Sequence, residues 1–406
     1  MIETIGVKMI KKTNVNVKNA ILIGALCGVS YFAVYVARNI LSAVSPQMLA
    51  SGFTEEYIGT ASSVFFIVYA IGQLINGFIG DKIKARYMMS FGLVLAGICN
   101  IVYPFVSASN ISSIIVYGIT GFFLAMIYGP MTKVIAENVE PEYVARCGLG
   151  YEFGALLGTP TAGLLAAIFP MLFVFEIGGG MLLLMGIVAF ISFLVLERKG
   201  VVSYGKYEAL KTGGKANVTV LLKHQIVKFC FIAVITGVVR TSVVFWLPTY
   251  ISQYLGFSSE VSATIFSAVT LVISLTAFLA VFIYERLKSM DKSIILSFSV
   301  ATVAFLMVWL IKHPIVNIIC LTIAIMGSGC VAAIMWCRYC PSLRDTGRVS
   351  AVTGFLDFLS YMAAAAANLI FANAVSEIGW GKLILIWFAL MVVGVIVSLP
   401  YKKLRR

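Results

Sequence analysis

Charged side chains are scarce in this sequence. Only 12% of its 406 residues are Asp, Glu, Lys or Arg, whereas 61% are hydrophobic. A soluble domain carries roughly 25% charged residues, so this chain has too few charges to coat a soluble surface of its size. The scarcity excludes an ordinary soluble protein and indicates that lipid surrounds most of the molecule.

Histidine is nearly absent, and the cysteines form no metal-binding pattern. His224 and His313 are isolated in or beside polar segments, and Cys337 and Cys340 form a single CxxC pair. A zinc site needs about four ligands at set spacings, and the sequence contains no evident nucleophile with a neighbouring base. We therefore predict no metal site, no cofactor and no catalytic residues, which means that the protein is not an enzyme.

Long apolar runs are abundant. A helix needs about 20 apolar residues to cross a bilayer, and these runs leave no room for a soluble catalytic domain. The sequence predicts an all-α integral membrane protein with twelve transmembrane helices. The predicted helices cover residues 20–45, 57–80, 87–108, 111–134, 146–169, 171–196, 226–254, 260–284, 293–311, 315–337, 348–374 and 382–401.

One polar stretch divides these runs into two sets of six. Residues 197–225 contain several lysines, and Gly213 and Gly214 add flexibility. We therefore predict an N-terminal six-helix bundle over residues 1–196, a cytoplasmic linker over 197–225, and a C-terminal six-helix bundle over 226–406.

The net charge of +13 is distributed unequally between the two sides of the predicted membrane protein. All but four of the 30 lysines and arginines lie in segments on the side of the N-terminus; the exceptions are Arg38, Arg240, Lys312 and Lys382. Because cytoplasmic loops carry an excess of Lys and Arg, both termini are predicted to be cytoplasmic, in the plasma or inner membrane of the cell. The charge is assigned to these loops, so no nucleic-acid partner is expected.

The two sets of six helices repeat each other. Arg38 is followed by Pro46 eight residues later, and Arg240 is followed by Pro248 at the same spacing. Further matches lie at near-constant offsets of 202–204 residues: 52–55 with 256–260, 81–84 with 285–288, and Arg146 with Arg348. These matches predict two parallel six-helix pseudo-repeats, an architecture that supports alternating access by rocking of the two halves.

The segment 77–86 resembles the loop signature between the second and third helices of the major facilitator superfamily. It contains Gly77, Asp81, Lys82 and Arg86. The resemblance implies the twelve-helix major facilitator fold. It also implies that this loop is a gating element, in which the glycine allows close helix approach and the charges form a cytoplasmic cluster that favours one conformational state.

A second motif narrows the resemblance. Tyr31, Tyr35 and Arg38 in the first predicted helix, together with Arg240 and Pro248 in the seventh, resemble the organophosphate:phosphate antiporter family. That family includes bacterial glycerol-3-phosphate and hexose-phosphate transporters, and the resemblance extends over nearly the whole chain. It implies that Arg38 and Arg240 hold the phosphate moiety of the substrate.

The chemistry of these residues agrees with that role. An arginine at the middle of a membrane costs about 2.5–3.5 kcal/mol on insertion scales, so each needs either a fixed carboxylate partner or an anionic ligand. Guanidinium groups match phosphate and carboxylate with paired hydrogen bonds. Tyr31, Tyr35 and Arg38 share one helix face by their spacing. Together with Arg240, Tyr128 and Gln73, these three residues form the predicted substrate-binding set.

This chain departs from the family at several positions. Asn39 and Gln73 stand where the family commonly has lysines, and Gly237 stands where it has a tyrosine. The chain also has buried acids in Glu152 and Asp357. These two carboxylates either pair with the arginines or carry a proton after desolvation, and the sequence does not choose between these roles.

We therefore predict a monomeric secondary transporter in the lipid bilayer that moves a small organic anion by alternating access. The predicted cargo is a phosphorylated metabolite, such as a sugar phosphate, taken up by antiport against inorganic phosphate. One alternative is a proton-coupled symporter of a carboxylate or amino-acid-like solute. The other is a membrane sensor of a phosphorylated sugar that does not transport.

Overall fold

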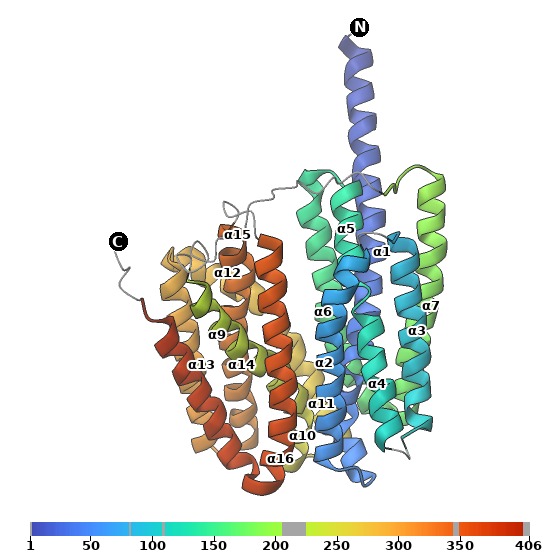
Figure 1. The fold of residues 1–406 in the computed structure, drawn as a ribbon. Helices are drawn as coiled ribbons and strands as arrows, with labels where there is room; N and C mark the ends of the chain where they lie inside the picture. The colour runs from blue at the N-terminus through green and yellow to red at the C-terminus, as the bar shows by residue number, and fades with distance from the viewer. Residues whose placement is uncertain (1, 81–82, 108–109, 205–224, 344–348, 401–406) are drawn as a thin grey trace. The chain divides into compact units, whose positions relative to one another are not determined.

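The computed structural model describes residues 2–80, 83–107, 110–204, 225–343 and 349–400, and every regular element in these ranges is a helix (Figure 1). The first half contains α1 (Ile2–Ala50), α2 (Glu55–Gly80), α3 (Ala85–Phe105), α4 (Asn110–Leu124), α5 (Tyr128–Asn138), α6 (Pro141–Ile168) and α7 (Met171–Arg198). The second half contains α9 (Ile226–Gly237), η1 (Val238–Val243), α10 (Val244–Gln253), α11 (Ser259–Ser274), α12 (Thr276–Leu287), α13 (Met290–Leu310), α14 (Pro314–Ile334), η2 (Met335–Tyr339), α15 (Cys340–Ser342) and α16 (Val349–Ser398).

These helices confirm the predicted all-α membrane fold. Among the described residues, 10 helical segments are long and apolar enough to cross a membrane, by length and composition. One of them, Val352–Ser398, is interrupted at Gly379, where φ is 75°. Leu156–Ile168 is a further, shorter apolar helix. Each predicted transmembrane run therefore has a helical counterpart in the described residues.

The matched turns of the two halves share a backbone conformation and a cap. Gly52 follows α1 with φ 93°, and Gly256 follows α10 with φ 77°, values that favour glycine at a helix end. The next hydroxyl residue caps the following helix in both halves. The hydroxyl of Thr54 accepts a hydrogen bond from the amide of Tyr57 at 3.2 Å. The hydroxyl of Ser258 accepts one from the amide of Val261 at 3.4 Å. The repeated Gly-Phe-hydroxyl pattern thus encodes the same stop and start signals twice.

Several predicted continuous runs are interrupted. The run 260–284 divides into α11 and α12 at Leu275, where hydroxyls on both sides bond back to the preceding turn. Ser274 donates to the carbonyl of Leu271, and Thr276 donates to that of Ile273. Such side-chain bonds compete with the helical ladder and bend it.

Two further runs contain π-helical turns. These are η1, which includes Arg240, and η2, which includes Arg338. A π-helical turn inside an α-helix is rare and is often found at functional positions. Each of these turns thus places an arginine within a membrane-crossing segment.

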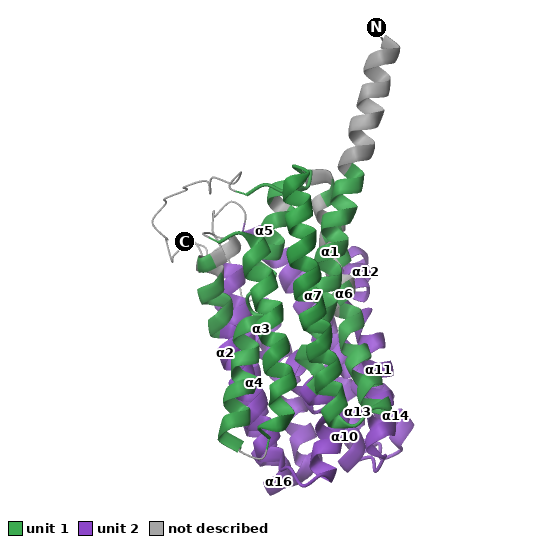
Figure 2. Cartoon of the chain, turned by 90° about the vertical axis from the view of Figure 1, so that its right-hand side faces the viewer, with its two compact units in different colours: residues 1–40, 71–211 green, residues 41–70, 212–406 purple. Residues whose placement is uncertain are grey.

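The chain forms two compact units (Figure 2). One consists of residues 1–40 and 71–211, and the other of residues 41–70 and 212–406. Helices α1 and α2 are each divided between the units, so residues 41–70 group with the helices of the C-terminal half. The predicted bundle boundaries at 196 and 226 remain a prediction.

Candidate functional site

The first unit brings four predicted residues together beside α1. The guanidinium carbon of Arg38 lies 5.4 Å from the centre of the Tyr35 ring, and the Tyr31 and Tyr35 rings are 5.0 Å apart. The ring of Tyr128, at the start of α5, is 5.8 Å from that of Tyr31. The helical spacing of the α1 residues produces the predicted face, and the packing of α5 adds Tyr128 to it.

Tyr117 of α4 belongs to the same region and was not predicted. Its side chain is buried, and its hydroxyl interacts electrostatically with Arg38. The Tyr117 ring also packs 5.2 Å from that of Tyr103. Tyr117 lies in a uniformly apolar run, so nothing in the local sequence marks it as a neighbour of the arginine.

Asn39, which stands where the family commonly has a lysine, forms hydrogen bonds within the first unit. Its amide donates to the carbonyl of Tyr35 at 2.7 Å and to the hydroxyl of Thr159 on α6 at 3.1 Å. The side chain therefore ties α1 to α6 within the first unit. The remaining predicted residues of this unit are Gln73, half-buried on α2, and Glu152 of α6, whose side chain lies outside the described residues.

In the second unit, Arg240 is exposed in the middle of a membrane-crossing segment. It lies on η1, between α9 and α10. Two contacts fix the backbone of this segment against α16. The hydroxyl of Ser242 donates to the carbonyl of Ala364 at 2.8 Å, and a Cβ atom at Gly237 would lie 2.4 Å from the carbonyl oxygen of Ser360. The π-helical turn is thus anchored on both sides of the arginine, whose side chain projects from it.

Asp357, the other predicted acid, is half-buried on α16 in the turn before Ser360. Tyr361 follows on the same helix, and its ring lies 6.1 Å from that of Phe66 and 5.2 Å from that of Tyr69. Asp357 therefore belongs to the segment of α16 that packs against the anchored stretch around Arg240.

The predicted gating loop is described in part. Asp81 and Lys82 lie outside the described residues, as does the side-chain position of Gly77, whereas Arg86 is buried at the start of α3. Nη1 of Arg86 pairs with Oε2 of Glu197 at 2.8 Å. This pair joins the first residues of α3 to the last turn of α7.

The segment that follows α7 completes this cluster. The hydroxyl of Tyr204 donates to Oε1 of Glu197 at 2.9 Å, and the amide of Ser203 donates to Oδ1 of Asn138 at 2.7 Å. Burial and the hydrogen bond to Glu197 raise the pKa of the Tyr204 phenol, so it remains a donor at neutral pH. Glu197 and Tyr204 fall in the predicted linker, where spacing alone did not identify them as partners of Arg86.

Among the described residues, no group of three or more His, Cys, Asp or Glu side chains is arranged to hold a metal ion. Apart from the carboxylates of Asp357 and Glu152, the polar groups of the candidate site are guanidinium, phenol and amide groups. In the described structure they fall into two sets, one around Arg38 and one around Arg240. These groups donate hydrogen bonds and carry positive charge, which suits the recognition of an oxyanion.

Two bacterial proteins are similar in sequence to parts of this chain. The chain is 33% identical over 94 residues to the membrane sensor protein UhpC of Salmonella typhimurium, covering 23% of this chain and 21% of the sensor. It is 26% identical over 265 residues to the glycerol-3-phosphate transporter of Bacillus subtilis, covering 59% of each chain. The aligned regions thus span less than two thirds of either relative.

The fold is shared with solved transporters. A crystal structure of a D-xylose-proton symporter superposes with a TM-score of 0.72, covering 94% of this chain and 97% of that chain at 12% identity. Residues 27–368 match the family described as the Major Facilitator Superfamily. The matched region includes the Arg38 cluster, Arg86 and the Arg240 turn, and the chain therefore belongs to the Major Facilitator Superfamily.

Proposed function

We propose that this protein is a secondary transporter of a small organic anion, and that its cargo is a phosphorylated metabolite exchanged for inorganic phosphate. The observation that carries the proposal is the pair of arginines within membrane-crossing segments. Arg38 is held among tyrosines, and Arg240 is exposed on an anchored π-helical turn. Arginine is costly and therefore rare at this depth, where it often marks a substrate pathway, and a guanidinium matches the geometry of a phosphate group.

The similarity to the glycerol-3-phosphate transporter of Bacillus subtilis supports this choice of substrate class. The phenols beside Arg38 provide hydrogen-bond donors for phosphate oxygens. The excess of Lys and Arg on one side supports a cell-membrane location with both termini in the cytoplasm. We expect the protein to act as a monomer.

Alternating access is supported by the hydrogen bonds of residues 41–70. The hydroxyl of Ser42 donates to the carbonyl of Phe245 at 2.6 Å, and the hydroxyls of Ser45 and Thr249 lie 2.8 Å apart. On α2, the hydroxyl of Ser63 donates to the carbonyl of Ala365 at 2.7 Å. These bonds join the predicted outer ends of α1 and α2 to α10 and α16. We assign them to a closed outer gate, which must separate when the site opens outward.

Removing two of these hydroxyls is expected to open the outer gate more often. Each buried hydroxyl bond contributes about 1 kcal/mol, so the Ser42→Ala, Ser63→Ala double variant should raise the open population by about tenfold or more. A cysteine introduced at Ala372, which is 1% exposed beside Gly59, would report opening through its labelling rate with a membrane-impermeant maleimide.

The matched control is Ser51→Ala in the same reporter background. Ser51 is an exposed residue directly after α1, and its hydroxyl donates to the carbonyl of Gln47 at 2.8 Å, so its removal should leave labelling unchanged. Equal labelling rates in the double variant and the unmodified protein would contradict the assignment of these bonds to the outer gate.

The function is tested with purified protein in liposomes loaded with phosphate. We expect uptake of labelled phosphate that depends on internal phosphate and persists when the proton gradient is collapsed. Competition by glycerol 3-phosphate and by hexose phosphates would define the cargo. Uptake that disappears with the proton gradient would contradict the antiport proposal and favour proton symport through Asp357 or Glu152.

A sensor is the second candidate function, because the chain is also similar to the membrane sensor protein UhpC. In that case the same anions should stabilise the protein against thermal unfolding while counterflow remains at the level of empty liposomes. Saturable counterflow would rule out a sensor that does not transport.

A further inference from the structure

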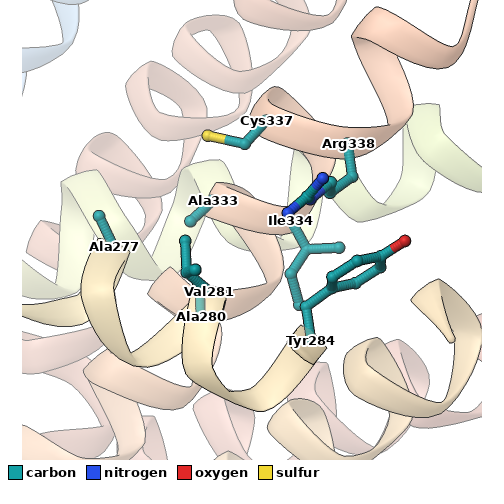
Figure 3. A pocket seen from close by; sticks show the side chains of 8 residues that line it. All are labelled: Ala277, Ala280, Val281, Tyr284, Ala333, Ile334, Cys337 and Arg338. Carbon is teal, nitrogen blue, oxygen red and sulfur yellow. The ribbon is translucent and has the colours of Figure 1, made fainter. Parts of the chain in front are cut away.

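A groove lies on the second unit between α12 and α14 and continues onto η2 (Figure 3). The empty space along it is about 230 Å³, which includes space open to the surroundings. Most of its wall is aliphatic and is formed by small or branched side chains, which are Ala277, Ala280, Val281, Ala333 and Ile334. The polar groups of its lining lie at one end, where Tyr284 and Arg338 meet. The groove is therefore amphipathic along its length.

A cation–π contact holds Arg338 in place. Its side chain is exposed, and its guanidinium carbon lies 4.4 Å from the centre of the Tyr284 ring. Such a contact is an electrostatic attraction to the ring, so it occupies none of the N–H donors with an oxygen acceptor. Among the described residues, no carboxylate forms an ion pair with Arg338. The arginine is thus oriented toward the groove and still able to bind an anion.

The polar end of the groove lies at a membrane surface. The membrane-crossing segments that contain Tyr284 and Arg338 end at Leu287 and Tyr339, three residues and one residue beyond them. Arg286 and Lys288, both exposed, follow directly on α12 and at its end. The distribution of Lys and Arg predicts that this surface is cytoplasmic, where anionic lipid headgroups attract basic side chains.

The aliphatic part of the groove lies on an exposed apolar surface. Phe278 and Phe282 of α12 are each 65% exposed, and Val281 is 44% exposed. In a membrane protein such a surface contacts acyl chains. A soluble phosphate would use the arginine but would leave the aliphatic wall unoccupied. The joint presence of the wall and the cation therefore favours a ligand that has both a hydrocarbon chain and an anionic group.

We propose that this groove binds one anionic phospholipid of the cytoplasmic leaflet. An acyl chain lies along Ala277, Val281 and Ala333, and the headgroup phosphate accepts hydrogen bonds from Arg338, which Tyr284 orients. This site is separate from the proposed function, because it involves neither Arg38 nor Arg240.

The test is native mass spectrometry of the full-length protein in detergent, titrated with phosphatidylglycerol or phosphatidylcholine. We expect one phosphatidylglycerol molecule to be retained preferentially. Arg338→Gln should lower its occupancy by about fivefold, the effect of removing one basic side chain from an anionic surface. Lys292→Gln removes an exposed cation at the start of α13, outside the groove, and should leave occupancy unchanged.

A second variant tests the aliphatic wall while leaving the arginine in place. Ala277 is exposed, so Ala277→Phe should fill the groove without disturbing the buried core and should lower lipid occupancy. Leu279→Phe places a ring on the same helix outside the groove lining and should have no effect. Elution of each variant as the same monodisperse peak would establish that it is folded.

Three results would overturn the proposal. The first is equal retention of phosphatidylglycerol and phosphatidylcholine. The second is unchanged occupancy in both Arg338→Gln and Ala277→Phe. The third is displacement of the bound lipid by millimolar inorganic phosphate, which would assign the arginine to a soluble anion. None of these results depends on phosphate exchange, so failure here is distinguishable from failure of the transport proposal.

Discussion

Replacing Arg38 or Arg240 with lysine is expected to reduce phosphate exchange by about 10- to 100-fold. Lysine keeps the positive charge but cannot form the paired, coplanar hydrogen bonds of a guanidinium. A hydrogen bond to a charged group contributes about 1.5–3 kcal/mol, and each 1.36 kcal/mol corresponds to a factor of ten in rate. The measurement is the initial rate of labelled phosphate counterflow in liposomes that contain equal amounts of protein.

Arg198→Lys provides the matched control. Arg198 is an exposed arginine in the last turn of α7, so the same substitution should leave the exchange rate unchanged there. If Arg38→Lys and Arg240→Lys both retained exchange at the unmodified rate, these arginines would not be the phosphate ligands. If only one of the two variants lost phosphate exchange, the arginine replaced in that variant would be the main phosphate ligand.

The surroundings of Arg38 and Arg240 differ, so the two lysine variants are not equivalent tests. Arg38 already contacts Tyr35 through a cation–π interaction, and Tyr31 and Tyr128 lie beside it. Arg240 has its backbone anchored by neighbours, while its own side chain is exposed. A lysine at position 38 would therefore also change the packing of a tyrosine cluster. Arg240→Lys is the cleaner test of the guanidinium itself.

Restoring the family's tyrosine at position 237 is expected to destroy the folded C-terminal half. In the structure, a Cβ atom at Gly237 would lie 2.4 Å from the carbonyl oxygen of Ser360 and 2.8 Å from its Cα. These are backbone atoms, so α9 and α16 would have to separate. Gly237→Tyr should yield little monodisperse protein after extraction. Gly237→Ala, which adds the Cβ alone, should lower the free energy of unfolding by about 1–3 kcal/mol.

Gly180→Ala is the control for this series. Gly180 lies inside α7, and a Cβ atom there would meet nothing within 4 Å. Because alanine also favours helix over glycine, this variant should be as stable as the unmodified protein or slightly more stable. The readout is the thermal midpoint by size-exclusion chromatography. A stable, monodisperse Gly237→Tyr protein would contradict the close approach of α9 and α16.

The glycine at 237 also changes how the departures from the antiporter family are interpreted. In the sequence, Asn39 and Gln73 in place of the family's lysines indicate a site with less positive charge. In the structure, the backbone of α16 occupies the space that a side chain at position 237 would need. The Asn39 side chain joins α1 to α6. The residues at positions 39 and 237 therefore both contribute to helix packing. The groups around Arg38 also include Tyr117, which the resemblance to the family did not indicate.

The features that could be predicted from sequence are those that depend on neighbours along the chain. Hydropathy located the membrane-crossing runs, because a bilayer requires about 20 apolar residues in succession. Helical spacing placed Tyr31, Tyr35 and Arg38 on one face. The repeated Gly-Phe-hydroxyl pattern predicted corresponding turns, and Gly52 and Gly256 adopt the same left-handed conformation.

The features that required the tertiary structure are contacts between helices far apart in the chain. Arg86 pairs with Glu197, and Tyr117 lies by Arg38. Hydropathy cannot find such neighbours in a membrane protein, because lipid-facing and buried surfaces are equally apolar. Phe282 is 65% exposed and Tyr117 is 2% exposed, although both lie in apolar runs. Chain order therefore defined the helices, the repeat, the arginines and the tyrosines beside Arg38 on α1, whereas helix packing selected the neighbours from other helices, such as Tyr117.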